Sequence, residues 1–319
     1  MVPDRSSSPP EPAAVAVRPA VPSAVRPAVP VVDLAAAPDV VDRLVADAAA
    51  GYGLMRVRNH GLSPLIRGLL AAAGDVFGRI DADPTLAASV TAGADYAGYT
   101  GPLSVRLDDS GTATEPDLHR SWNWSTWTTA PWDQLPAAFG QLARAWQDQT
   151  GRLLADRFLA GLSKVAGLDL AAAYGRPRLA CRINDYPAYD RNPGTGQLRA
   201  GAHRDYGPLT AVVPDGPGLQ VQVGGRWVDV PYVPGELVVN VGDELRALAA
   251  LHGRPPGAIA PARHRVLAPP APQPRRQSLV AFWFGAADTV VDRRPDGTPV
   301  TSAEYVMFRV EAADARGDR

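Results

Sequence analysis

Two histidines and one aspartate are spaced so that together they could bind a metal ion. In His203-Arg204-Asp205 an imidazole and a carboxylate stand two residues apart, and on a strand such residues point to the same face. His264 lies downstream in Arg-His-Arg-Val, at the start of another predicted strand. Two histidines and one carboxylate occupy one face of an octahedral metal and leave the other positions open, which is typical of non-haem Fe(II) oxygenases. The spacing therefore predicts an iron site made of His203, Asp205 and His264.

A second pair of polar residues follows His264 along the chain. Arg276 and Ser278 are again two residues apart on a predicted strand, so they share a face. An arginine guanidinium can donate two parallel hydrogen bonds to a carboxylate, and a serine hydroxyl beside it can donate a third. A metal site next to such a clamp is what an iron enzyme with an oxoacid co-substrate requires. We therefore expect Arg276 and Ser278 to bind that co-substrate.

The first half of the chain has mainly helical spacing of apolar residues. Val40, Val41, Leu44 and Val45 recur at helical intervals, and Ser63 is a suitable N-cap for the next helix. The elements expected are a strand at 31–34, a helix at 38–50, a strand at 52–58, a helix from Ser63 through Val76, loops at about 82–130 and a helical segment at about 136–173.

After residue 178 the pattern changes to short β-type runs separated by glycine and proline. No helical segments intervene, so parallel βαβ units are disfavoured and a barrel or sandwich is favoured. The chain is therefore expected to be an α+β protein with helices first, β structure second and a helix at 302–314. The expected strands are 179–184, 208–213, 218–223, 226–230, 236–241, 263–267 and 277–284.

Composition and charge exclude several function classes. The chain has 319 residues, and its 32 basic and 33 acidic side chains give a net charge of −1, so neither nucleic acid nor an anionic membrane is expected as a partner. Cys181 is the only cysteine, which excludes an internal disulfide and a multi-cysteine metal site. No apolar run reaches the roughly 18 residues of a membrane span, and the N-terminus lacks a signal-peptide profile. A cytoplasmic protein is expected, with no requirement for an oligomer.

Several motifs occur in the order and spacing of a known family. They are Val29-Pro30-Val31-Val32-Asp33-Leu34, Gly53-Leu54-Met55-Arg56-Val57, Asn59-His60-Gly61, Arg182-Ile183-Asn184-Asp185-Tyr186-Pro187, Leu219-Gln220-Val221, Val239-Asn240-Val241-Gly242-Asp243-Glu244-Leu245, His264-Arg265-Val266 and Arg276-Gln277-Ser278. From about residue 30 to 290 the chain thus resembles the isopenicillin N synthase-like branch of the Fe(II)/2-oxoglutarate-dependent dioxygenases. Each motif is modest alone, but their order is specific.

The resemblance implies a fold, cofactors and further site residues. It implies a double-stranded β-helix (jelly-roll) core with the N-terminal helices packed around it, and a reaction that uses Fe(II), 2-oxoglutarate and O2. Asn184 and Tyr186 match the family's Asn-x-Tyr-Pro positions, where the tyrosine often helps to bind 2-oxoglutarate. By the same resemblance, Arg276 and Ser278 would bind its distal carboxylate. The sequence departs from the pattern at Leu251-His252-Gly253, where the family usually has Thr-Asn-Gly, and in a slightly long, proline-rich segment before Arg276.

The chain divides into four segments on these grounds. Residues 1–30, rich in proline and alanine, predict a flexible arm. Residues 31–175 form the mainly helical segment, 176–290 the Fe(II)/2-oxoglutarate jelly-roll core, and 291–319 a C-terminal extension with a helix.

Other candidate residues have weaker claims to a role. His252 competes with His264 as a ligand, but it lies in a glycine- and proline-rich stretch rather than on a strand. His60 is interpreted as a turn residue. His119 could line a substrate pocket, although packing is the favoured interpretation for it and for the Phe282–Phe284 run. Cys181 is interpreted as a small buried strand residue.

Three alternatives stay open. The first is an isopenicillin N synthase-like oxidase that does not use 2-oxoglutarate, since such enzymes also carry an Arg-x-Ser. The second is a non-catalytic jelly-roll binding protein, and the third is a structural zinc site, which three ligands disfavour because such sites usually have four. The substrate is expected to be a small molecule. Because Lys164 is the only lysine, the composition is typical of high-GC coding as in actinobacteria, where secondary metabolism of the antibiotic type is the expected setting.

Overall fold

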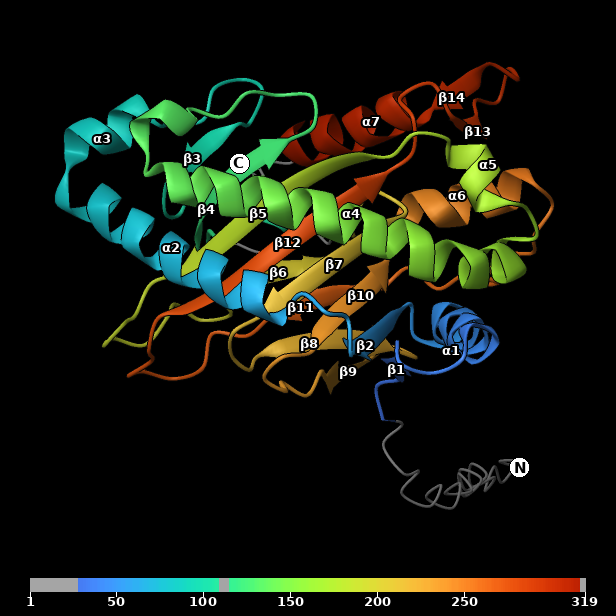
Figure 1. Ribbon diagram of the computed structural model, residues 1–319, viewed down its shortest axis with the longest axis horizontal. Coiled ribbons are helices and arrows are strands. Elements are labelled where there is room, and N and C mark those ends of the chain that lie inside the picture. Colours follow the sequence, from blue (N-terminus) through green and yellow to red (C-terminus); the bar gives the residue numbers. More distant parts are fainter. Residues whose placement is uncertain (1–27, 109–114, 316–319) are drawn as a thin grey trace, which may run out of the picture.

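The computed structural model describes the backbone of residues 28–108 and 115–315. An eight-stranded sheet with the order β1-β2-β10-β7-β12-β5-β4-β3 runs through the centre (Figure 1). Its strands are β1 (Val31–Asp33), β2 (Leu54–Arg58), β3 (Gly98–Thr100), β4 (Arg120–Ser125), β5 (Arg178–Tyr186), β7 (Leu209–Pro214), β10 (Leu237–Val241) and β12 (Arg276–Phe284). A smaller sheet has the order β6-β11-β8-β9, and its strands are β6 (Ala200–His203), β8 (Leu219–Val223), β9 (Arg226–Asp229) and β11 (His264–Val266). A hairpin of β13 (Val290–Arg293) and β14 (Pro299–Thr301) completes the strands described.

Helices cover one side of the large sheet, where α4 crosses in front of several strands (Figure 1). The 30-residue α4 ends at Gly167, whose φ of 75° gives the left-handed C-cap that glycine adopts without strain. The helices are α1 (Pro38–Gly51), α2 (Ser63–Ala82), α3 (Pro84–Ser89), the 3-10 turn η1 (Trp132–Gln134), α4 (Ala137–Ala166), α5 (Leu170–Tyr174), α6 (Asp243–Leu251) and α7 (Ser302–Ala315). Within the described ranges, none of them is long and apolar enough to cross a membrane.

The large sheet has two faces with different chemistry. On β10, Leu237, Val239 and Val241 belong to the hydrophobic core that the helices cover, and we call this side the outer face. Val238 instead joins residues of β6, β8 and β11 in a second core between the two sheets, and we call this side the inner face. Because side chains alternate along a strand, each central strand supplies one set of residues to the helices and another to the space between the sheets.

The predicted α+β class and most of the predicted elements are confirmed. The loop expected at about 82–130 was wrong in part, since α3, β3 and β4 lie within it. Side chains of β4 point alternately to the two faces of the sheet. Trp122 and Trp124 are buried in the outer core, and Asn123 between them lies on the inner face. Pairing with β5 along its whole length stabilises this short strand, and that long-range contact is invisible to local periodicity. Residues 1–27, nearly all of the predicted flexible arm, lie outside the described ranges.

Asp185 joins three elements on the outer face. Its side chain is fully buried, and it accepts hydrogen bonds from Arg120 Nε at 2.7 Å, from Arg275 Nε at 2.5 Å and from Gln277 Nε2 at 3.3 Å. Arg120 also pairs with Asp81 of α2. A buried carboxylate with this many donors is stable only while all of them remain in place. The network therefore links β4, β5 and the start of β12 to α2.

We predict that Asp185→Ala lowers the free energy of unfolding by about 3–5 kcal/mol, because it leaves two guanidinium groups facing a buried position without their shared acceptor. Urea denaturation monitored by circular dichroism measures the change. Asp148→Ala is the control: Asp148 pairs only with Arg152 on the exposed side of α4, and its removal should change stability by less than about 1 kcal/mol. Equal effects of the two substitutions would contradict this account of Asp185.

Candidate metal centre

The structure brings His203, Asp205 and His264 together. His203 ends β6 and His264 begins β11, and the antiparallel register places the two directly opposite each other with ring centroids 4.4 Å apart. One ligand atom from each of the three residues lies within 4.8 Å of the others. Asp205 and His264 are buried, and His203 is partly buried. A single ion could contact all three side chains.

Asp205 reaches this position by a different route from the one expected. The sequence argument placed it on one strand with His203, but β6 ends at His203, and Asp205 lies in the connection to β7. Backbone bonds hold that connection: Asp243 N donates to Asp205 O at 2.9 Å, and Gly242 N donates to Pro208 O at 3.1 Å. A Cβ on Gly242 would lie 2.0 Å from Gly207 O, so this close approach requires glycine. The Val-Gly-Asp sequence after β10 thus fixes the turn that carries Asp205.

Hydrogen bonds orient the two imidazoles. His203 Nδ1 donates to Gly201 O at 2.8 Å, and His264 Nδ1 donates to Ala262 O at 3.0 Å. A carbonyl can only accept, so each Nδ1 carries the proton and each Nε2 keeps its lone pair for a metal. Each ring is therefore oriented with its Nε2 available to a metal.

The carboxylate of Asp205 is oriented and kept ionised. Asn240 Nδ2, on the inner face of β10, donates to Asp205 Oδ2 at 2.5 Å. Burial by itself would raise the pKa of Asp205, but the neighbouring His264 and His203 and the hydrogen bonds from Thr210 and Asn240 outweigh it, so the pKa lies below the ordinary value. A carboxylate beside two imidazoles is the donor set that a divalent transition metal binds.

The predicted clamp lies on the same inner face. In the register of β12 and β5, Arg276 stands opposite Tyr186 and Ser278 stands opposite Asn184. Asn184 Nδ2 donates to Ser278 Oγ at 3.4 Å, and the Arg276 guanidinium lies 4.9 Å from the centroid of the Tyr186 ring. The four residues predicted from the sequence are therefore neighbours.

Arg276 has donor capacity that the described residues do not use. Its Nε donates to Gly216 O and Pro217 O at 3.3 and 3.1 Å, whereas its Nη1 is buried without a hydrogen-bond partner in residues 28–108 and 115–315. Asn184 Oδ1 is likewise buried and unpaired there. An unpaired buried donor on a guanidinium is costly unless a ligand satisfies it, and a carboxylate does so best. The residues therefore fit an oxoacid.

Two further residues lie beside this clamp: Arg199, to which the sequence gave no role, and His119, for which packing was the favoured interpretation. Arg199, which is buried, lies with its guanidinium 5.9 Å from the Tyr186 ring and 5.3 Å from the Tyr189 ring. His119 Nδ1 donates to Arg199 O at 3.0 Å, and its ring centroid lies 5.9 Å from that of Tyr186. Burial lowers the pKa of His119 to about 3, so it is neutral. No spacing singles out Arg199; a cation four residues before His203 was the one available signal.

The remaining histidines lie apart from the centre. His252 is exposed just after α6, and His60 is bonded through Nε2 to Gly235 O at 2.8 Å. The preference for His264 over His252 as the third member of the cluster thus agrees with the geometry.

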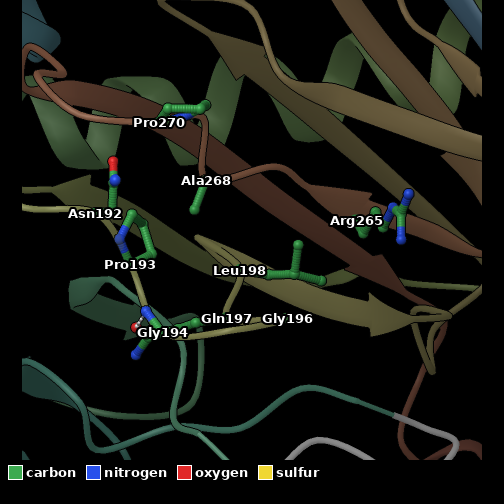
Figure 2. A pocket seen from close by; sticks show the side chains of 9 residues that line it. All are labelled: Asn192, Pro193, Gly194, Gly196, Gln197, Leu198, Arg265, Ala268 and Pro270. Atoms are coloured by element: carbon green, nitrogen blue, oxygen red, sulfur yellow. Dashed lines mark hydrogen bonds between the residues drawn. The ribbon is translucent and has the colours of Figure 1, made fainter.

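A surface recess of about 410 Å³ is lined by residues other than the three candidate ligands (Figure 2). It is bordered by the segment before β6, by Arg265 of β11 and by the segment after β11, and it contains none of the predicted iron or clamp residues. Its lining residues are Asn192, Pro193, Gly194, Gly196, Gln197, Leu198, Arg265, Ala268 and Pro270. None of these lining residues belongs to the group of candidate metal ligands, so we place the metal chemistry at that group, between the two sheets.

Comparison with known proteins points to one superfamily. Residues 178–285 match the model of the 2OG-Fe(II) oxygenase superfamily. The chain is 28% identical over 215 residues to a flavonol synthase/flavanone 3-hydroxylase of Petunia hybrida, covering 65% of this chain and 61% of that protein. It is 30% identical over 224 residues to the validamycin A dioxygenase of Streptomyces hygroscopicus subsp. limoneus, covering 64% and 60%. The matches thus span less than two thirds of the length of these two relatives.

A solved structure has the same fold. The structure of JOX2 in complex with 2OG, Fe and JA matches with a TM-score of 0.69 and 22% identity over 90% of this chain and 87% of that chain. The arrangement of N-terminal helices around a two-sheet core is therefore the jelly-roll architecture that the sequence predicted.

We predict that the purified protein binds one divalent ion at this cluster, and that Asp205→Ala or His264→Ala weakens binding by more than about 100-fold, because each removes a ligand. Titration of the metal-free protein with Co(II), followed by visible absorption, measures the affinity. His252→Ala is the matched histidine control and should bind as the wild type does. An equal loss with His252→Ala would refute the assignment.

Asn240→Leu tests the orientation of the carboxylate separately. Loss of a partner that orients a metal ligand typically weakens metal binding about 10- to 100-fold, and the same Co(II) titration should show a loss in that range. Wild-type affinity in this variant would mean that the Asn240–Asp205 hydrogen bond has no part in metal binding.

Proposed function

Because residues 178–285 match the model of the 2OG-Fe(II) oxygenase superfamily, we propose that the chain is an Fe(II)- and 2-oxoglutarate-dependent dioxygenase that oxidises a small molecule. One observation carries the proposal: a cluster of two histidines and an aspartate, held by the smaller sheet and the connection after β6, faces the inner face of the large sheet, where the buried Nη1 of Arg276 has no partner among the described residues. The cofactors are Fe(II) and the co-substrate 2-oxoglutarate.

The predicted iron ligands and the Arg-x-Ser pair each have a place in this proposal. His203, Asp205 and His264 would hold the iron, and Arg276 and Ser278 would hold the distal carboxylate of 2-oxoglutarate. Fe(II), together with 2-oxoglutarate and O2, supplies the oxidising power when bound, and 2-oxoglutarate becomes succinate and CO2.

The chain itself contributes orientation, charge and exclusion of water. Asn240 holds the Asp205 carboxylate, and the low pKa of Asp205 keeps it ionised for a cation. Arg276 offers a buried guanidinium, stacked on Tyr186, whose charge would balance a carboxylate. The second core, which lies between the two sheets, borders this space with apolar side chains of β8 and β10. Orientation by rigid strands is what such a reaction needs from the protein.

Two observations support a class of substrate. The named activities of the Petunia and Streptomyces relatives concern a flavonoid and validamycin A, which supports a small secondary metabolite of the antibiotic type for this chain. The arginine-rich composition supports the same setting. The outcome would be hydroxylation, desaturation or ring closure, since these differ only in where the substrate lies relative to the iron. A cytoplasmic location and independence from an oligomer remain predictions.

An oxidase of the isopenicillin N synthase type, which uses no 2-oxoglutarate, is the second candidate. The Arg-x-Ser pair is common to both types, so the clamp alone does not separate them. The buried Arg276 Nη1 needs an acceptor in either type, and the likeness to a named dioxygenase of Streptomyces supports the 2-oxoglutarate-dependent type.

We predict that the protein releases succinate when Fe(II), 2-oxoglutarate and O2 are supplied, slowly without substrate and faster with it. Arg276→Gln should raise the KM for 2-oxoglutarate by at least about 30-fold, since it removes a charged hydrogen-bond partner from a desolvated site. Succinate is measured by chromatography.

Arg265→Gln is the matched control for that prediction. Arg265 lies on β11, donates to Gln220 and stacks on Trp227, so its loss should leave the KM for 2-oxoglutarate unchanged. Substrate oxidation without any succinate would support the oxidase instead and overturn the proposal.

A further inference from the structure

A second buried arginine lies beside the predicted clamp, and the proposed function gives it no task. Arg199 immediately precedes β6 and is only 4% exposed. Its guanidinium carbon lies 5.9 Å from the centroid of the Tyr186 ring, and that of Arg276 lies 4.9 Å from the same centroid. Burial lowers the pKa of Arg199, and the nearby charge of Arg276 lowers it further. Two cations therefore approach one tyrosine at the end of β5.

Backbone contacts fix where the Arg199 side chain begins. Arg199 N donates to Val266 O at 3.0 Å, which extends the pairing of β6 with β11, and His119 Nδ1 donates to Arg199 O at 3.0 Å. From the end of the smaller sheet the side chain crosses toward the large one, where its Nη2 donates to Pro274 O, just before β12, at 3.0 Å. Arg199 thus reaches the clamp from the sheet opposite Arg276.

Each of the two arginines keeps a buried donor without a partner. Within residues 28–108 and 115–315, Arg199 Nε and Arg276 Nη1 are buried and form no hydrogen bond. The bonds that these two guanidinium groups do form among those residues go only to backbone carbonyl oxygens, which carry no charge. A buried cation without an anionic partner is unfavourable. A purely structural role would leave Arg199 Nε unpaired, whereas an anion bound at the clamp would give both donors an acceptor.

The charges at the clamp balance when one carboxylate binds there. Asp215, just after β7, acts on both arginines through its charge, and its Oδ1 accepts a hydrogen bond from Gln277 N at 2.7 Å. Asp185 also acts on Asp215, but it is already paired with two other arginines on the outer face. Two guanidinium charges less the one carboxylate charge of Asp215 leave one positive charge. Asp215 alone would neutralise Arg276, so Arg199 is the source of the unmatched charge.

We propose that Arg199 and Arg276 together bind the distal carboxylate of 2-oxoglutarate, one from each sheet, and that Arg199 makes the site selective for an oxoacid with a second charged end. This inference rests on the proposed function, because it takes 2-oxoglutarate to be the co-substrate. It adds to the Arg-x-Ser pair a residue that lies on neither β5 nor β12.

Binding to metal-loaded protein that cannot turn over tests the proposal. The full chain is loaded with Zn(II), which does not support the oxidation, and isothermal titration calorimetry measures the affinities of 2-oxoglutarate and 2-oxopentanoate. The second acid has the same five-carbon chain and the same 2-oxoacid end, with a methyl group in place of the distal carboxylate. We expect the wild type to bind 2-oxoglutarate at least about 100-fold more tightly than 2-oxopentanoate.

Substitutions of Arg199 separate its charge from its packing. Arg199→Met should lower the ratio of the two affinities at least about 10-fold by weakening 2-oxoglutarate alone, and an unchanged affinity for 2-oxopentanoate shows that the site is intact. Arg199→Lys should keep part of the ratio, because it keeps the charge without the planar fork. Arg265→Met is the matched control: Arg265 also stacks on an aromatic ring, 4.1 Å from the centroid of Trp227, and its loss should leave both affinities unchanged.

Asp215→Asn tests the charge balance by itself. It removes the negative charge that opposes a bound carboxylate, and it keeps an oxygen that can accept the hydrogen bond from Gln277 N. We expect it to tighten binding of 2-oxoglutarate at least about 3-fold and, combined with Arg199→Met, to restore part of the lost affinity.

The outcomes are distinguishable. If the Zn(II)-loaded wild type does not bind 2-oxoglutarate, the proposed function itself is wrong. If it binds 2-oxoglutarate but binds 2-oxopentanoate equally well, the inference about Arg199 is overturned. The same holds if Arg199→Met keeps the full preference or weakens both acids alike, since Arg199 would then be structural. A lack of tightening in Asp215→Asn would overturn the charge balance from which the inference follows.

Discussion

The site depends on the alternation of side chains across the central strands of the large sheet. Every second residue of β5, β10 and β12 packs under the helices, and the residues between them face the smaller sheet. This single constraint places Asn240, Ser278 and Asn184 on one surface, although they are far apart in the sequence. A slip of one residue in any of these strands would exchange polar and apolar faces, so the apolar outer core also fixes the register of the polar residues.

The metal ligands add a second requirement, which the smaller sheet and a backbone clamp meet together. The pairing of β6 with β11 sets His203 opposite His264, and the start of α6 fixes the turn that carries Asp205. Three arginines lie on or beside the inner face, together with the carboxylate of Asp215. Arginine stays charged under all ordinary conditions, so these groups need anionic ligands rather than a change of protonation. The predominance of cations is consistent with a site that takes up acids.

Sequence alone identified the residues of the cluster and of the clamp, because their types and spacing are specific even before folding. The sequence argument wrongly placed Asp205 on the same strand as His203. The end of β6 depends on its pairing with β11, which a local pattern does not reveal. The sequence argument also missed β4, whose alternation is short and is stabilised by β5. The place of Arg199 beside Arg276 depends on the pairing of β6 with β11 and of β5 with β12, which residue spacing does not reveal. Long-range pairing accounts for each of these differences.

The central claim is that the three ligands and Arg276 form one site for Fe(II) and 2-oxoglutarate. Anaerobic addition of Fe(II) and then 2-oxoglutarate to the metal-free protein, followed by visible absorption, tests it most directly. The account predicts a charge-transfer band that requires both additions, is lost in His264→Ala and needs far more 2-oxoglutarate in Arg276→Gln. A protein that stays colourless at saturating Fe(II) and 2-oxoglutarate, or a band unaffected by both substitutions, would contradict it.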